Sequence, residues 1–150
     1  MLTKTAERVA DNTCEETNAR IRRQTEANIE HYGRRGPQAI TRRLGELDAE
    51  WDIERCLETM APILTLTGIG LGITANKRWF FLSAVVQGFF LQHALQGWCP
   101  PLPVLRSFGI RTAQEIESER VALKVCRGDF ANFSAEGGGS TRQAINAATR

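Results

Sequence analysis

The central stretch of the chain reads TMAPILTLTGIGLGITAN at residues 59–76 and WFFLSAVVQGFFLQHALQGW at residues 79–98. Neither segment contains Asp, Glu, Lys or Arg, although a histidine, His93, interrupts the second, and only Lys77 and Arg78 separate the two segments. At ~1.5 Å per residue the two helices would each reach about 27–30 Å, close to the ~30 Å hydrocarbon core of a bilayer. The stretch therefore predicts an all-α fold class built on a two-helix transmembrane hairpin, 59–76 and 79–98, with the lipid bilayer as its main partner.

The charges of the 150-residue chain are unevenly placed around this stretch. Of the 36 charged residues, 22 lie in 1–58, 12 in 106–150 and two in 59–105. A soluble helix of such length normally carries a charged face, so the gap favours membrane insertion. Four threonines and three glutamines dilute the two segments, and a soluble all-helical interaction protein with a buried 59–98 stays as the weaker alternative. The net charge of +2 argues against a nucleic-acid partner, which would call for a strongly basic domain.

Small residues recur four apart in both segments. Such stripes let helix backbones approach closely in lipid, either within the hairpin or between copies of the chain. Gln87 lies in the middle of its segment and should face a helix partner, because an unpaired amide costs free energy in lipid. The expected helix–helix interface, in a homo-oligomer or with a membrane-protein partner, comprises Gly68, Gly72, Ala84, Gly88 and Gln87.

Tryptophan and arginine positions suggest how the hairpin would lie in a membrane. Trp51, Trp79 and Trp98 are expected to be interfacial anchors, since amphipathic rings favour the headgroup level. The turn carries two basic residues, whereas the flanks carry five: Arg42, Arg43, Arg55, Arg106 and Arg111. This bias predicts that both termini are cytoplasmic.

The flanking segments are expected to be polar and helical. Residues 1–58 form an N-terminal arm, in which a helix from Pro37 to Leu57 would place one apolar stripe, Ile40, Leu44, Leu47 and Trp51, on one face. Residues 99–133 combine a proline corner with an amphipathic helix. That helix should start at the Thr112–Glu115 capping box, run to about Arg127, stop at Gly128, and bury Ile116, Leu123 and either Val125 or Cys126. Residues 134–150 are expected to be a flexible tail.

Three short motifs carry a family resemblance: Trp51-Asp52-Ile53-Glu54-Arg55, Gly97-Trp98-Cys99-Pro100 and Gly109-Ile110-Arg111-Thr112. Together with the glycine-rich hairpin, they resemble the YgaP-like inner-membrane domain family. The resemblance implies two short transmembrane helices, a bacterial inner-membrane location and attention to Cys99. Some members carry a rhodanese sulfurtransferase domain ahead of the hairpin. This chain has 58 mostly polar residues there, so sulfurtransferase activity is not carried over.

Cys99 is the sharpest candidate for chemistry. A thiol near the interface could accept sulfane sulfur as a persulfide, and the alternative is a structural corner in which the thiol only packs. His93 has no evident partner, and its six-residue distance from Cys99 places the two on different faces of a continuous helix. The spacing of the four cysteines and two histidines predicts no metal site and no cofactor.

Without a catalytic constellation, the expectation is a non-enzymatic membrane anchor or scaffold that self-associates or binds a partner. The alternative is a membrane-tethered sulfur or thiol acceptor that uses Cys99.

Overall fold

The computed structural model describes residues 7–131, which form seven α-helices and no strand. The helices are α1 (Arg8–Asp11), α2 (Glu15–Gly33), α3 (Pro37–Ala49), α4 (Ile53–Thr74), α5 (Trp79–Gln96), α6 (Leu102–Ser107) and α7 (Ala113–Arg127). The all-α class is confirmed for this part of the chain. The tail expected at 134–150 lies outside the described residues.

The described residues divide into two units, each assembled from segments far apart in the chain. The first unit contains residues 7–22 and Trp51–Gln114. Its buried cluster consists of Val9, Ile53, Leu57, Cys99 and Leu102. Burial of this cluster brings α1, the start of α4, and the segment after α5 together.

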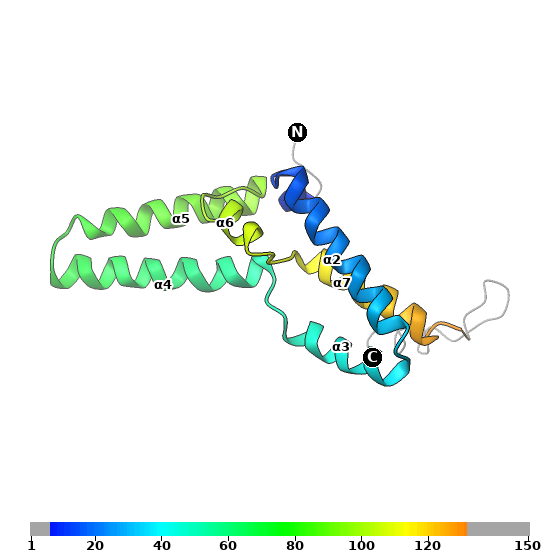
Figure 1. Ribbon diagram of the computed structural model, residues 1–150. Coiled ribbons are helices and arrows are strands. Elements are labelled where there is room, and N and C mark those ends of the chain that lie inside the picture. The colour runs from blue at the N-terminus through cyan, green and yellow to red at the C-terminus, as the bar shows by residue number, and fades with distance from the viewer. Residues whose placement is uncertain (1–6, 132–150) are drawn as a thin grey trace, which may run out of the picture. The chain divides into compact units, whose positions relative to one another are not determined.

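Helices α4 and α5 lie side by side in the first unit and run in opposite directions (Figure 1). Asp52 caps α4 through its side chain, which accepts a hydrogen bond from the Arg55 amide at 2.7 Å. The turn is made at Asn76, whose side-chain oxygen accepts from the Arg78 amide at 2.9 Å. Helix α5 ends at Gln96 because Gly97 adopts a left-handed conformation, with φ of 77°.

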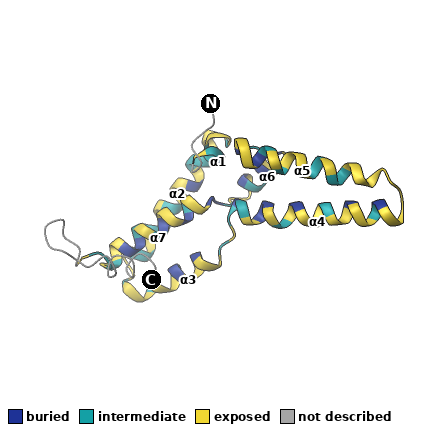
Figure 2. Cartoon of the chain, turned by 180° about the vertical axis from the view of Figure 1, so that it is seen from behind, coloured by how far each residue is buried: buried dark blue, intermediate teal, exposed yellow. Residues whose placement is uncertain are grey.

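Most large apolar side chains of α4 and α5 are exposed (Figure 2). Ile73 and Phe81, for example, are each 74% exposed. By length and composition, one described helical segment, Pro37–Thr74, could cross a membrane, and its apolar part lies in α4. Only 22% of that apolar part is buried, whereas a core helix of a soluble protein would be mostly buried. Helix α5 does not meet the same criterion; it contains Gln87, Gln92, His93 and Gln96.

The second unit contains Arg23–Glu50 and residues 115–131. Its core joins α3 to α7 through Ile40, Leu44, Leu47, Ile116 and Leu123, with Tyr32 of α2 packed against them. Arg43 of α3 donates to Glu119 of α7 at 2.8 Å, and Glu119 is fully buried. The second unit therefore contains an ion pair next to its apolar core.

Two sequence expectations about these helices have different outcomes. Helix α7 starts directly after Thr112 and ends at Arg127, with Gly128 at φ of 87°, so its predicted bounds are confirmed. The predicted continuous helix from Pro37 to Leu57 is wrong. Helix α3 ends at Ala49 because Glu50 is extended and Asp52 starts a new helix, so Trp51 leaves the apolar stripe. Val125 and Cys126 are both exposed rather than buried.

Candidate functional site

Cys99 lies in the corner that follows α5. The chain leaves α5 at Gly97, whose amide donates to the His93 carbonyl at 2.7 Å. It then turns back through Cys99 into the short helix α6, which starts at Leu102. Cys99 is 3% exposed and belongs to the core cluster of the first unit. This corner therefore directs the thiol toward the interior of the unit.

His93 faces this thiol. The distance from Cys99 Sγ to His93 Nδ1 is 3.6 Å, and the imidazole is 1% exposed. The expectation that the two residues lie on different faces of one helix is wrong, because Cys99 is outside α5. The left-handed Gly97 returns the chain to the turn of α5 that carries His93. A glycine just after a helix is a known signal for such a reversal, and it was visible in the sequence.

Glu54 at the start of α4 binds the other ring nitrogen. His93 Nε2 lies 3.1 Å from Glu54 Oε2. An ionised carboxylate can only accept, so Nε2 carries the proton and donates it to Glu54. In the neutral imidazole, Nδ1 is then the free acceptor that faces the thiol. The three side chains thus form a nucleophile, a base and a residue that orients the base, the arrangement that activates nucleophiles in enzymes.

Arg8 completes this row of polar side chains. Its guanidinium donates to Glu54 Oε1 at 3.1 Å and to the Ala94 carbonyl at 3.5 Å. Arg106 is the Lys or Arg residue nearest to Cys99 along the sequence. Arg106 is instead buried and donates to Thr13, Asn18 and Ile110. Arg8 and Glu54 were missed because no sequence signal relates positions 8, 54 and 93.

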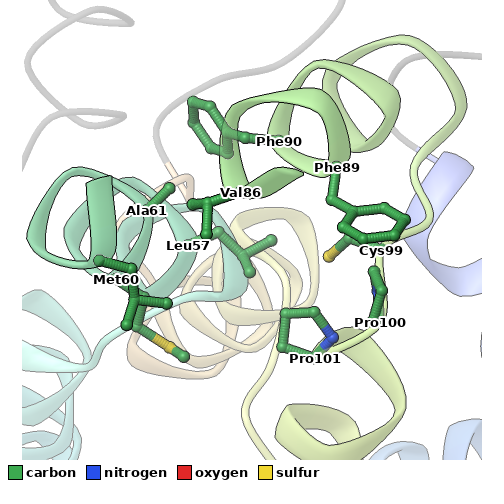
Figure 3. Close-up of a pocket in the computed structure, with 10 residues that line it drawn as sticks. Leu57, Met60, Ala61, Val86, Phe89, Phe90, Cys99, Pro100 and Pro101 are labelled. Carbon is green, nitrogen blue, oxygen red and sulfur yellow. The ribbon is translucent and has the colours of Figure 1, made fainter. Parts of the chain in front are cut away.

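An apolar pocket opens beside Cys99 (Figure 3). Its volume is about 160 Å³, and its walls come from α4, α5 and the proline corner. The lining includes Leu57, Leu64, Val86, Phe89, Phe90 and Pro101, besides Cys99 itself. Figure 3 shows the Cys99 sulfur on the side of the corner that faces Leu57 and Val86. A ligand in this pocket would therefore have the thiol at its wall.

The structure separates the residues expected to form a helix–helix interface. Gly68 and Gly72 of α4 face α5, since a Cβ added at Gly68 would overlap Ser83 Oγ and one at Gly72 would lie 2.9 Å from the Phe80 ring. Ala84 and Gly88 are exposed, and nothing lies within 4 Å of a Cβ added at Gly88. The two small-residue stripes therefore do not face each other.

Gln87 does contact the neighbouring helix. Its side-chain amide donates to the Thr65 hydroxyl at 2.9 Å. The Ser83 hydroxyl donates to the Thr65 carbonyl, also at 2.9 Å. Thr65 is therefore a second polar contact of α4 with α5, besides the hydrogen bond between Glu54 and His93.

The three tryptophans differ in their surroundings. Trp51 is 47% exposed and stacks with the Arg55 guanidinium, which lies 4.5 Å from the ring centroid. Trp79 is 44% exposed at the start of α5. Trp98 is partly buried and packs against the core cluster around Cys99. Two of the expected anchors are thus available at the surface, and Trp98 also supports the corner.

Within residues 7–131, no group of three or more His, Cys, Asp or Glu side chains is placed to hold a metal ion. Cys14, Cys56, Cys99 and Cys126 are all free thiols. A hydrogen bond with the Thr17 side chain lowers the pKa of the exposed Cys14 thiol. Cys14 would therefore compete with Cys99 for any thiol reagent.

In comparisons with known proteins, no family model, no curated protein and no solved structure matches the chain.

Proposed function

We propose that the protein is a small integral membrane protein in which α4 and α5 form a transmembrane hairpin. The observation that carries this proposal is the exposure of large apolar side chains along both helices, including Ile63, Leu66, Ile73, Phe81 and Leu91. In water, so large an apolar surface favours aggregation. In a bilayer the same surface would contact the hydrocarbon chains of the lipids, which are apolar as well.

The polar groups of the two helices support this placement. Lipid offers no hydrogen-bond partner, so polar side chains within a spanning segment must be paired inside the protein. Ser83 and Gln87 both donate to Thr65 across the hairpin. The hydroxyls of Thr67 and Thr74 donate to backbone carbonyls four residues earlier in α4.

We place the hairpin in a bacterial inner membrane with both termini cytoplasmic, on the basis of the YgaP-like resemblance and the excess of arginines in the flanks. In this role the hairpin anchors the protein and associates with a second copy or a membrane partner. Membrane fractionation tests the placement. The protein should stay in the pellet after a carbonate wash and need detergent for extraction, and release into the carbonate supernatant would contradict insertion.

The contact between Cys99 and His93 favours a second function, a membrane-tethered thiol acceptor. With Nε2 bound to Glu54, His93 can take the thiol proton on Nδ1 and leave Cys99 as a thiolate, the nucleophilic form. A cysteine that only packed in a corner would not need a base held by a carboxylate.

Alkylation by iodoacetamide tests this reactivity. The protein should carry Cys14→Ser, Cys56→Ser and Cys126→Ser, so that Cys99 is the one thiol left. Its alkylation rate at neutral pH should exceed that of the unfolded protein, and His93→Gln should lower it by about a hundredfold. Equal rates with and without His93 would show that the thiol only packs.

A further inference from the structure

The geometry points to an acyl thioester as the substrate of Cys99, with the acyl chain bound in the apolar pocket between α4 and α5. This inference rests on the proposed thiol reactivity and names the group that the thiol accepts.

The surroundings of the Cys99 thiol determine which kind of substrate can reach it. Cys99 is 3% exposed and lines the apolar pocket, so a substrate reaches the sulfur through this pocket. The pocket that reaches the sulfur is lined by aliphatic and aromatic side chains, such as Leu57, Val86 and Phe90. A narrow, flexible hydrocarbon chain fits these walls, whereas a charged chain would lose its hydration in the pocket.

The pocket has the size of the first part of an acyl chain. A cavity of about 150 Å³ lined by aliphatic and aromatic side chains holds a benzene molecule, which has six carbons. The 160 Å³ pocket therefore accommodates roughly six carbons of a chain. Met60 and Leu64 line it and are partly exposed on α4, so a longer chain can continue along the outside of the hairpin.

The chemical step balances with the groups present. His93 Nδ1 takes the thiol proton, and Cys99 Sγ forms a bond to the carbonyl carbon of the thioester. The bond between that carbon and the donor sulfur breaks, and the proton held on His93 goes to the departing thiolate. One thioester is exchanged for another, so the step needs no oxidant or reductant.

Acyl-coenzyme A esters of increasing length test the inference on detergent-solubilised protein with Cys99 as the one thiol. Mass spectrometry should show a hydroxylamine-sensitive adduct on Cys99, and Cys99→Ser should abolish it. From acetyl to hexanoyl the rate should rise by about fourfold per methylene, as each methylene leaves water for the pocket, and then level off. A rate that does not depend on chain length would overturn the inference.

A pocket-filling variant separates this inference from the proposed function. Val86→Trp should slow hexanoylation at least about tenfold more than it slows alkylation by iodoacetamide, because the six-carbon chain needs far more of the pocket than the small reagent does. Leu91→Trp, which places the same new side chain on an exposed position of α5 outside the pocket, should change neither rate.

Three outcomes are distinguishable. Fast, His93-dependent alkylation without chain-length preference would reject the acyl chain and keep the thiol acceptor. A persulfide formed from a small sulfane donor without any acyl adduct would do the same. Slow alkylation with or without His93, together with no acyl adduct, would reject both proposals.

Discussion

The thiol of Cys99 lies 3.6 Å from Nδ1 of His93 because Gly97 turns the chain back at the end of α5. This contact depends on a backbone position that other residues fill poorly. Gly97 has a φ of 77°, and a Cβ there would lie 2.6 Å from the Arg8 carbonyl oxygen. Gly97 thus allows two things at once: the chain turns so that the thiol contacts the imidazole, and α1 packs closely against the turn.

Gly97→Ala should therefore destabilise the protein more than the same substitution at a left-handed glycine with no neighbouring atoms, where only the unfavourable backbone conformation costs free energy. Gly128 is the matched control, since its φ is 87° and nothing lies within 4 Å of an added Cβ. Gly128→Ala should cost about 1–2 kcal/mol in the free energy of unfolding, and Gly97→Ala at least about 1 kcal/mol more. Chemical denaturation followed by circular dichroism measures both. Equal losses would show that the Arg8 contact is unimportant.

The close approach of α4 and α5 at Gly68 leads to a second prediction. Gly68→Ala should lower the free energy of unfolding by about 1–3 kcal/mol, because the new methyl group would overlap Ser83 and the Trp79 carbonyl. Gly70→Ala is the control, as nothing lies within 4 Å of a Cβ there, and it should stabilise the helix by about 0.5–1 kcal/mol. Thermal unfolding in detergent measures the difference, and the same sign for both variants would contradict the packing described.

The ion pair of the second unit gives a third prediction. Glu119→Ala leaves Arg43 without its buried partner and should cost about 3 kcal/mol. Glu30→Ala removes an exposed pair with Arg34 and should cost less than about 1 kcal/mol. Denaturant unfolding of the two variants compares them. A small effect of Glu119→Ala would mean that Glu46 and Glu50, the other partners of Arg43, replace the lost carboxylate.

The fourth prediction concerns how the contribution of Asp129 to stability depends on pH. Two hydrogen bonds from the Arg127 guanidinium hold the pKa of the Asp129 carboxyl below its usual value. Its stabilising contribution is therefore complete above the pKa of the unfolded state, about 3.9, and is lost as the pH falls through the lower pKa of the folded state. The stability difference between the native chain and Asp129→Asn should vanish in that acidic range. A difference that stays constant down to low pH would contradict this.

The fifth prediction concerns Glu54 as the residue that positions His93. Glu54→Gln can still accept the hydrogen bond from Nε2 but no longer supplies a negative charge. The alkylation rate of Cys99 should fall by about tenfold, and its pH profile should move to higher pH, because the imidazolium that accompanies the thiolate loses its counter-charge. A lower rate with an unshifted profile would indicate a merely structural role.

Local signals in the sequence were sufficient for helix bounds where capping residues are strong. Gly128 correctly ends α7, and Pro37 correctly opens α3. The helix predicted through Trp51 failed because its apolar spacing continued across a break that Asp52 makes by capping the next helix. The spacing of apolar residues indicates which of them share one face of a helix, but it does not show where the backbone leaves the helical conformation.

The candidate site was only partly predictable. Cys99 was singled out by the motif around it, but its partners come from α1, α4 and α5. Arg8, Glu54 and His93 meet only when the cluster around Ile53 and Leu102 is buried. A single sequence contains no information on such long-range pairing, whereas Gly97 was a readable sign that the chain reverses before Cys99.

The two bonds that Thr65 accepts from Ser83 and Gln87 also fix the register of the hairpin. A slip of one helix by a single turn, about 5.4 Å, would take both donors away from Thr65. Apolar contacts alone would tolerate such a slip, because one leucine or phenylalanine replaces another. The hydrogen bonds to Thr65 thus favour the observed register over registers that are shifted by one turn. The observed register also brings Glu54 of α4 level with His93 of α5.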